Sequence, residues 1–393
     1  MRATNEILKM HMNELCEVIG ARATGSEANK AAVQYAADQF KRLGYEVTLQ
    51  EFSCMDWNNK GSRLVVGKEE IEVSAAEYSL PCNVNGQLVC VETIDQLKAA
   101  ELSGKICVLH GELCKEPLMP KSMIFWNPEE HQEIIRELEM KKPLAVITVS
   151  FIPDAAVPII QDGDFEIPCA AVKGELAEVL LNGDNADLQL MTERRPSRAS
   201  NVIASYGAGK QKINFSAHID TKPDTPGALD NASGAAVLLA LAEKTAGTDS
   251  PYQIEFVLFN GEDYYSTPGE VAFMNTYLKN PENYICAVNV DGVGLKDSST
   301  SYSFYEYPKN YQNIVDNLAG LLKNVEKIDP WPMGDHMLFA VSGIPAVAIT
   351  AVEIFRLMET IMHTPQDNLS YIDYKILEEV VGFLSKYIET FSY

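Results

Sequence analysis

The sequence predicts an α/β fold in which helices sandwich a mixed, mostly parallel sheet. Over the C-terminal half of the chain, short apolar runs of strand length alternate with helical patterns. Several runs are apolar at almost every position, as strands are when helices cover both faces of their sheet. The chain has 393 residues, 46% of them apolar and 22% charged, so it can form roughly two or three domains with large cores.

The chain opens with a predicted helix and a predicted strand. Apolar side chains recur at helical spacing over residues 27–43, with Ser26 at the N-cap position and Gly44 at the C-cap position. Residues 45–52 then alternate between apolar and polar side chains, which is typical of a half-buried strand.

The character of the sequence changes over residues 55–197. Short strand-like runs alternate there with charged or turn-rich stretches, and residues 194–200 (RRPSRAS) are polar and basic, as in a linker. We therefore expect a discontinuous main domain formed by residues 1–54 and 198–393. A smaller, β-rich α/β domain is inserted at residues 55–197.

The segment after the linker contains the clearest alternation of strands and helices. The strand-like runs are NVIASY, KINFSAHID, IEFVLFNGED, ICAVNVDG and PAVAIT. Helical spacing is clearest over Ala232–Ala246, Gln312–Val325 and Tyr374–Ile388. This order is the pattern of an α/β sheet that is covered on both faces.

The chain is strongly acidic, with 32 Lys and Arg against 55 Asp and Glu and a net charge of −23. Such a protein repels phosphate backbones and anionic lipid surfaces, so we expect neither a nucleic acid nor a membrane as partner. No apolar run approaches the roughly 18 residues of a membrane span. The eight cysteines are scattered, and we expect reduced, buried thiols rather than a disulfide framework.

The first residues, MRATNEILKMHMNEL, lack the apolar core of a signal peptide. If the chain begins at its native start, we expect a cytoplasmic protein. If an export signal preceded it and was removed, secretion stays open as an alternative.

Two histidines and five carboxylates stand where predicted strands end or in the loops that follow. They are His218, Asp220, Asp230, Glu262, Asp263, Asp291 and His363. Because ligands of open α/β sheets bind beyond the carboxyl ends of the strands, we expect these side chains to converge. Histidine nitrogens combined with carboxylate oxygens form a ligand set that zinc usually occupies.

Each of these residues alone has an ordinary structural interpretation. An Asp after a strand commonly caps a turn or a helix, and an adjacent Glu–Asp pair is usually a solvated surface feature. A single His is usually a satisfied core or surface group. It is their joint placement at the strand ends that favours a metal site.

The same residues lie in ordered motifs. These are His218-Ile-Asp220, Gly227-Ala-Leu-Asp230-Asn231-Ala-Ser233-Gly234, Gly261-Glu262-Asp263, Asn289-Val-Asp291-Gly-Val-Gly294 and His363-Thr-Pro-Gln-Asp367. In this order they resemble the motifs of the co-catalytic di-zinc exopeptidases, the family of aminopeptidase S, aminopeptidase Y and glutamate carboxypeptidase. The resemblance covers residues 20–51 and 198–393 and implies the zinc-exopeptidase fold, which is of the phosphorylase/hydrolase type. Residues 55–197 resemble a protease-associated domain.

The resemblance implies two zinc ions as cofactors. By this resemblance His218 and Asp291 are ligands of one ion, and Asp263 and His363 are ligands of the other. Asp230 bridges the two ions. Other divalent metals also suit nitrogen and oxygen ligands.

Glu262 and Asp220 are the catalytic residues that the resemblance implies. Glu262 is the general base, and Asp220 accepts a hydrogen bond from the His218 ring, which fixes the tautomer of that ring. The chemistry agrees, because two cations about 3.5–4 Å apart need a bridging carboxylate and lower the pKa of a shared water. A carboxylate beside a ligand can accept the water proton and pass it to the departing amine.

Three positions depart from the family pattern. Many relatives have Glu in place of Asp263, some have Tyr in place of Met362, and a small residue is common in place of Glu270. Residues 334–336, Gly-Asp-His, match a Ser-Asp-His stretch of the family. A place in the pocket wall and a buried, hydrogen-bonded Asp–His pair are both open interpretations of this stretch.

These observations predict a metal-dependent exopeptidase. An aminopeptidase acting on peptides is favoured, because carboxylates such as Glu262 and Asp291 attract a free N-terminal ammonium group. The alternatives are a carboxypeptidase-like or other amide hydrolase and a non-catalytic receptor or scaffold protein with the same fold. The preferred residue, the native metal and the oligomeric state stay open.

Overall fold

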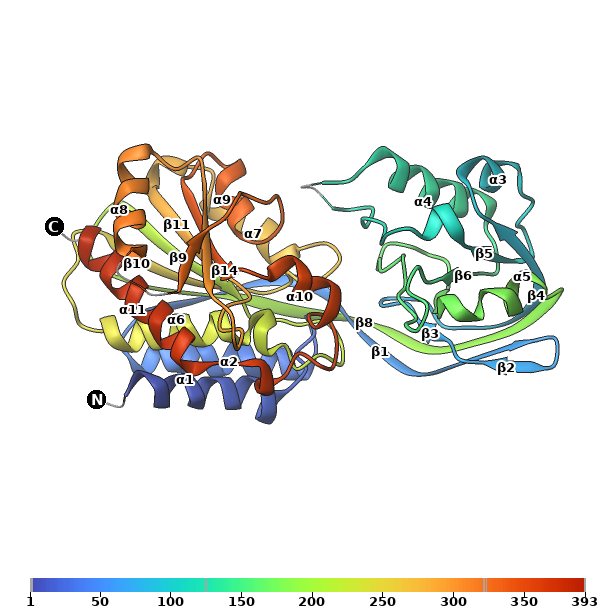
Figure 1. Cartoon of the computed structure of the whole chain (residues 1–393), viewed down its shortest axis with the longest axis horizontal. Coiled ribbons are helices and arrows are strands. Elements are labelled where there is room, and N and C mark those ends of the chain that lie inside the picture. Colours follow the sequence, from blue (N-terminus) through green and yellow to red (C-terminus); the bar gives the residue numbers. More distant parts are fainter. Residues whose placement is uncertain (1–2, 124–125, 321, 323, 392–393) are drawn as a thin grey trace. The chain divides into compact units, whose positions relative to one another are not determined.

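The computed structural model describes residues 3–123, 126–320, 322 and 324–391, which form two compact units (Figure 1). The first unit consists of Met1–Cys54 and Ser197–Tyr393, and the second consists of Met55–Pro196. The chain passes from one unit to the other inside two long strands, β1 (Glu46–Val66) and β8 (Asn185–Tyr206). All candidate site residues belong to the first unit.

A mixed sheet forms the centre of the first unit. Besides β8, its strands are β9 (Lys212–His218), β10 (Gln253–Phe259), β11 (Tyr284–Val290), β12 (Thr300–Tyr305), β13 (Val325–Lys327) and β14 (Ala346–Ala351). Their order is β13-β12-β14-β11-β9-β10-β8. The four strands from β14 to β10 are parallel, whereas β12 and β8 are antiparallel to their neighbours β14 and β10. The predicted mixed, mostly parallel sheet is confirmed.

Helices cover both faces of this sheet (Figure 1). They are α1 (Thr4–Asn13), α2 (Glu27–Arg42), α6 (Ser233–Thr245), α7 (Pro268–Tyr277), α8 (Lys309–Ala319), α9 (His336–Val341), α10 (Ile354–Thr360) and α11 (Tyr374–Phe391). On one face α6 contacts α1, α2 and α11. On the other face Phe273 of α7 and Phe339 of α9 pack against Phe259 of β10. Helices therefore bury the sheet from both sides.

Local sequence explains where α2 and α6 form. The hydroxyl of Ser26 accepts a hydrogen bond from the backbone N–H of Asn29 at 3.1 Å, which caps α2 as the sequence predicts. Almost every residue of α6 is buried, because the helix lies between the sheet and the outer helices α1 and α11. Its small and aliphatic side chains allow this packing on all sides.

The second unit is a smaller α/β unit. Its elements are β2 (Glu69–Ile71), β3 (Ser74–Ala75), β4 (Cys82–Val91), β5 (Ile106–Leu109), β6 (Ala145–Val149), β7 (Cys169–Val172), α3 (Ile94–Ala99), α4 (Glu129–Lys141) and α5 (Ala177–Leu181). Strands β4, β5, β6 and β7 are parallel, and β3 adds to β7 in the antiparallel sense. The assignment of this unit as a protease-associated domain stays a prediction.

Two local expectations are wrong. Residues 194–200 are not a linker but part of strand β8, which pairs with β1 along the chain. Pairing with β1 holds this polar segment in an extended conformation. Pro196 is tolerated in a strand at positions where the backbone nitrogen donates no hydrogen bond to a neighbouring strand. The helix expected over Gln312–Val325 ends at Ala319 before Gly320, and Val325 instead pairs with Thr300 of β12. Residues 321 and 323 lie outside the described part.

The eight cysteines, all in the described part of the chain, form no disulfide bond. Five are buried and three are half-buried, and burial raises the pKa of Cys107 to about 12. Among the described residues, no helix is both long and apolar enough to cross a membrane.

Phe256 of β10 provides a test of this core. The ring is fully buried and contacts the rings of Phe40, Tyr45 and Phe215. We expect Phe256→Ala to lower the free energy of unfolding by about 3–5 kcal/mol, because it leaves a cavity between α2 and the sheet. Urea unfolding followed by circular dichroism measures the change. The exposed Val341→Ala variant is the control, with an expected change within about 0.5 kcal/mol.

Candidate metal centre

Three neighbouring parallel strands bring the predicted residues to one edge of the sheet. His218 is the last residue of β9, Asp291 directly follows β11, and Glu262 and Asp263 lie in the loop after β10. These strands are parallel, so their carboxyl ends lie at the same edge. Asp230 reaches this edge from the turn before α6.

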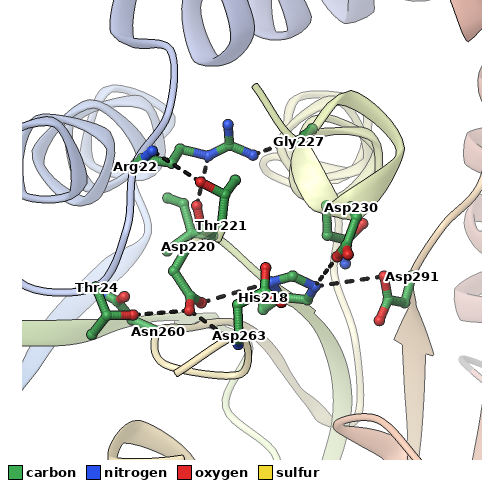
Figure 2. Close-up of polar contacts among 12 residues, drawn as sticks. Arg22, Thr24, His218, Asp220, Thr221, Gly227, Asp230, Asn260, Asp263 and Asp291 are labelled. Carbon is green, nitrogen blue, oxygen red and sulfur yellow. Dashed lines mark hydrogen bonds and ion pairs between the residues drawn. The ribbon is translucent and has the colours of Figure 1, made fainter. Parts of the chain in front are cut away.

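The first group of side chains surrounds the ring of His218 (Figure 2). Its Nε2 lies 2.9 Å from Oδ1 of Asp230 and 3.6 Å from Oδ1 of Asp291. His218 is fully buried, whereas 26% of the Asp291 side chain is exposed. The group is therefore open to solvent on its Asp291 side.

The second group surrounds the ring of His363. Its Nε2 lies 3.0 Å from Oδ2 of Asp230 and 3.0 Å from Oδ1 of Asp263. Asp230 therefore directs one carboxylate oxygen to each histidine and belongs to both groups. The His363 side chain is 43% exposed, whereas that of Asp263 is only 2% exposed.

The geometry of these contacts fits cation binding. In each group, one potential ligand atom per residue lies within 4.8 Å of the others. Within the described part of the chain, neither ring nitrogen of His218 nor Oδ2 of Asp263 has a hydrogen-bond partner, although Asp230 lies only 2.9 Å from His218. Buried polar atoms that converge without hydrogen bonding to one another are expected where they share a bound cation.

Asp220 lies behind the first group rather than within it. Its Oδ1 is 3.7 Å from Nδ1 of His218, which is longer than a hydrogen bond. Its Oδ2 accepts hydrogen bonds from the hydroxyl of Thr24 at 2.9 Å and from the backbone N–H of Asp263 at 3.2 Å (Figure 2). Asp220 thus holds the backbone at Asp263 in addition to facing the His218 ring.

A cavity of about 130 Å³ opens beside the two groups. Its polar lining residues include Asp230, Glu262, Asp291 and His363. Its apolar lining residues include Trp331, Met333, Ile349, Ile354, Met358 and Met362. Of these six residues the sequence places only Met362 at the site, because apolar side chains from loops, from β14 and from α10 look like ordinary core residues in the sequence.

Several acids lie close to Glu262. Burial raises the pKa of Glu262 well above its usual value, His218 opposes this, and Asp263, Asp335 and Asp291 raise the pKa further. A carboxyl group in such surroundings holds a proton more readily than an exposed one does.

Glu270 and Asp335 are buried acids near Glu262, and burial also raises the pKa of each. Glu270 lies in the first turn of α7, and Asp335 directly precedes α9. Gly334 and His336 line the cavity, whereas Asp335 does not. His336 therefore belongs to the pocket wall.

The fold and the donor set together define the class of this protein, an α/β metal-dependent hydrolase. Residues 201–388 match the model of peptidase family M28. The match confirms the predicted relationship to co-catalytic zinc exopeptidases and the prediction that the protein is a peptidase.

Curated relatives and a solved structure agree with this assignment. Aminopeptidase YwaD of Bacillus subtilis is 23% identical over 94% of this chain and 80% of its own length. The probable lipoprotein aminopeptidase LpqL of Mycobacterium tuberculosis is 23% identical over 67% of this chain, which spans only 54% of that relative. A zinc aminopeptidase from Bacillus subtilis has a similar structure, with a TM-score of 0.77 and 20% identity over 98% of this chain and 94% of that chain.

His336 makes the stability of the first unit depend on pH. Its buried ring lies against Tyr305 and Trp331, and burial lowers its pKa to about 4. Its unfolded pKa is about 6.5, so this stabilisation is complete above that pH and is lost as pH falls toward 4. The free energy of unfolding of the unmodified protein should therefore fall between pH 7 and pH 4.5. We expect this fall to be smaller in His336→Gln, by up to about 3 kcal/mol.

The measurement is urea unfolding of both proteins at the two pH values, with a chelator present so that acid release of metal does not contribute. An unchanged pH dependence in the variant would contradict a buried, neutral His336.

Proposed function

We propose that this chain is a two-zinc aminopeptidase that releases N-terminal residues from peptides. The observation that carries the proposal is Asp230, whose two carboxylate oxygens approach two different histidines within 3.0 Å. A carboxylate shared in this way is what a pair of adjacent cations requires. Its place at the mouth of a cavity supports a catalytic rather than a purely structural metal site.

The ligands divide between the two cations. His218 and Asp291 would hold one cation, His363 and Asp263 would hold the other, and Asp230, which belongs to both groups, would contribute to both sites. When bound, zinc acts as a Lewis acid and lowers the pKa of a water bound to it to near neutral. Asp263 is one methylene shorter than Glu, and Asp220 anchors its backbone N–H at 3.2 Å. This contact keeps the shorter ligand within reach.

Glu262 performs the proton transfers. It lines the cavity next to Asp263 without belonging to either ligand group. In the reaction its carboxylate accepts a proton from the attacking water, whose oxygen forms a bond to the peptide carbonyl carbon. When the carbon–nitrogen bond breaks, Glu262 donates that proton to the leaving amine. Burial, together with the neighbouring acids, raises its pKa and so favours the proton-carrying form between these two steps.

The cavity also suggests which end of a peptide binds and which side chain is preferred. The carboxylates of Glu262 and Asp291 attract a positively charged N-terminal ammonium group and repel a C-terminal carboxylate. Trp331 and the methionines that line the same cavity favour an apolar side chain on the N-terminal residue. Relatives named aminopeptidases support the same choice.

Removal of the base tests the mechanism without removing the ligands. We expect Glu262→Gln to lower kcat by about 100-fold or more, because the amide cannot accept the water proton. We also expect the variant to retain two zinc ions per chain, measured by mass spectrometry of the metal content. Hydrolysis of leucyl-p-nitroanilide gives the rate, and a chelator should abolish the activity of the unmodified protein.

Asp187→Asn is a control for the carboxylate-to-amide change, because this exposed residue lies in the second unit. Full activity of Glu262→Gln would refute the role of the base. One zinc ion in the unmodified protein would refute the two-metal site.

Substrate choice tests the remaining parts of the proposal. We expect leucyl and methionyl anilides to be hydrolysed about 10–200-fold more efficiently than the glutamyl anilide, as burial of one apolar side chain allows. N-acetylation of the leucyl substrate should remove nearly all activity, because the ammonium group is lost. Comparison of kcat/KM values measures both effects. Equal hydrolysis of the acetylated substrate would instead identify another kind of amide hydrolase.

A further inference from the structure

The segment that connects two of the ligands is held by a buried arginine. Residues 219–229 lead from His218 to Asp230. The guanidinium group of Arg22 donates hydrogen bonds to the carbonyl oxygens of Ile219 at 2.7 Å and Pro226 at 2.6 Å. It also donates one to the carbonyl oxygen of Gly227 at 3.0 Å (Figure 2). One rigid side chain thus joins the beginning of the segment to the turn before Asp230.

This arrangement needs an arginine. A planar guanidinium donates in several fixed directions, whereas a lysine ammonium is a single point at the end of a flexible chain. The backbone N–H of Arg22 also donates to the hydroxyl of Thr221 at 3.0 Å, so the segment is bound at its beginning as well as at its end.

The charge of Arg22 fits the same role. Arg22 is fully buried, and within the described part of the chain the hydrogen bonds of its guanidinium group go to carbonyl oxygens rather than to a carboxylate. A buried cation without an anion in contact is costly. Burial lowers the pKa of Arg22, and the nearby acids Asp220, Asp367 and Asp230 oppose this. The positive charge of Arg22 therefore offsets part of the repulsion among these carboxylates.

Asp367 holds the other side of the same turn. Its Oδ1 accepts a hydrogen bond from the backbone N–H of Leu229 at 2.7 Å, and its Oδ2 accepts one from that of Asp230 at 3.0 Å. Asp367 is fully buried and lies four residues after His363. It therefore connects the backbone of the shared ligand to the loop that carries a ligand of the second group.

We propose that Arg22 and Asp367 are positioning residues that hold Asp230 between the two cation sites. This inference rests on the proposed two-metal site. Arg22 binds carbonyl oxygens of the segment, and Asp367 binds the backbone N–H groups of Leu229 and Asp230. Since Asp230 belongs to both ligand groups, its displacement weakens both sites together, whereas loss of a ligand such as His363 weakens chiefly one.

The test is zinc binding to the full chain, measured by competition with a chromophoric chelator. We expect Arg22→Lys and Asp367→Asn each to weaken binding at both sites by about 10–100-fold. His363→Ala is the comparison, with the larger loss confined to one site. Circular dichroism and thermal unfolding of the metal-free proteins establish that the variants are folded.

The second unit offers matched controls. Arg194 donates to the carbonyl oxygens of Tyr78 and Phe165, and Asp162 accepts from the backbone N–H groups of Lys121 and Asp164. Arg194→Lys and Asp162→Asn make the same chemical changes as the two test variants, at similar, partly buried contacts to backbone groups. We expect both control variants to bind zinc as tightly as the unmodified protein does.

The outcomes separate this inference from the proposed function. If the unmodified protein binds no zinc, both fail. If it binds two ions, and the folded Arg22→Lys and Asp367→Asn variants keep the same affinity or lose only one site, the positioning role alone is refuted. Where Arg22→Lys does not fold, the result for Asp367→Asn decides.

Discussion

The shared position of Asp230 is the constraint on which the site depends. Its two oxygens approach His218 and His363, so a single carboxylate must lie between two rings from distant parts of the chain. Asp263 and Asp291 lie in the same small volume and repel it. The positive charge of buried Arg22 offsets part of this repulsion, and cations bound between the ligands would offset more of it, which explains why so many acids are tolerated at one edge of the sheet.

The parallel sheet supplies the first part of the geometry. Strands β9, β10 and β11 end side by side, and each places a histidine or a carboxylate directly after its last residues. Buried helices on both faces keep these strand ends in register. Asp230 and His363, in contrast, come from loops, and loops need further contacts to become rigid. Arg22 and Asp367 make such contacts.

The lining of the cavity combines two unlike kinds of side chain. It includes carboxylates and histidines, and also Trp331 with several methionines and isoleucines. The peptide end that we propose as substrate carries both a positive charge and an apolar side chain, so it suits both kinds. Burial and the neighbouring acids raise the pKa of Glu262, the group that we propose carries the proton during the reaction.

The sequence by itself determined the strand runs, the long helices and the seven polar residues at the sheet edge, because hydrophobic period and motif spacing are local properties. It missed the course of residues 194–200, because a polar segment forms a strand only when a partner such as β1 pairs with it. It also gave no indication that Arg22 reaches Gly227, or that α10 and Trp331 form one wall of the cavity. Only the tertiary structure decides such contacts, because they join residues far apart in the sequence through distances and directions that no local pattern encodes.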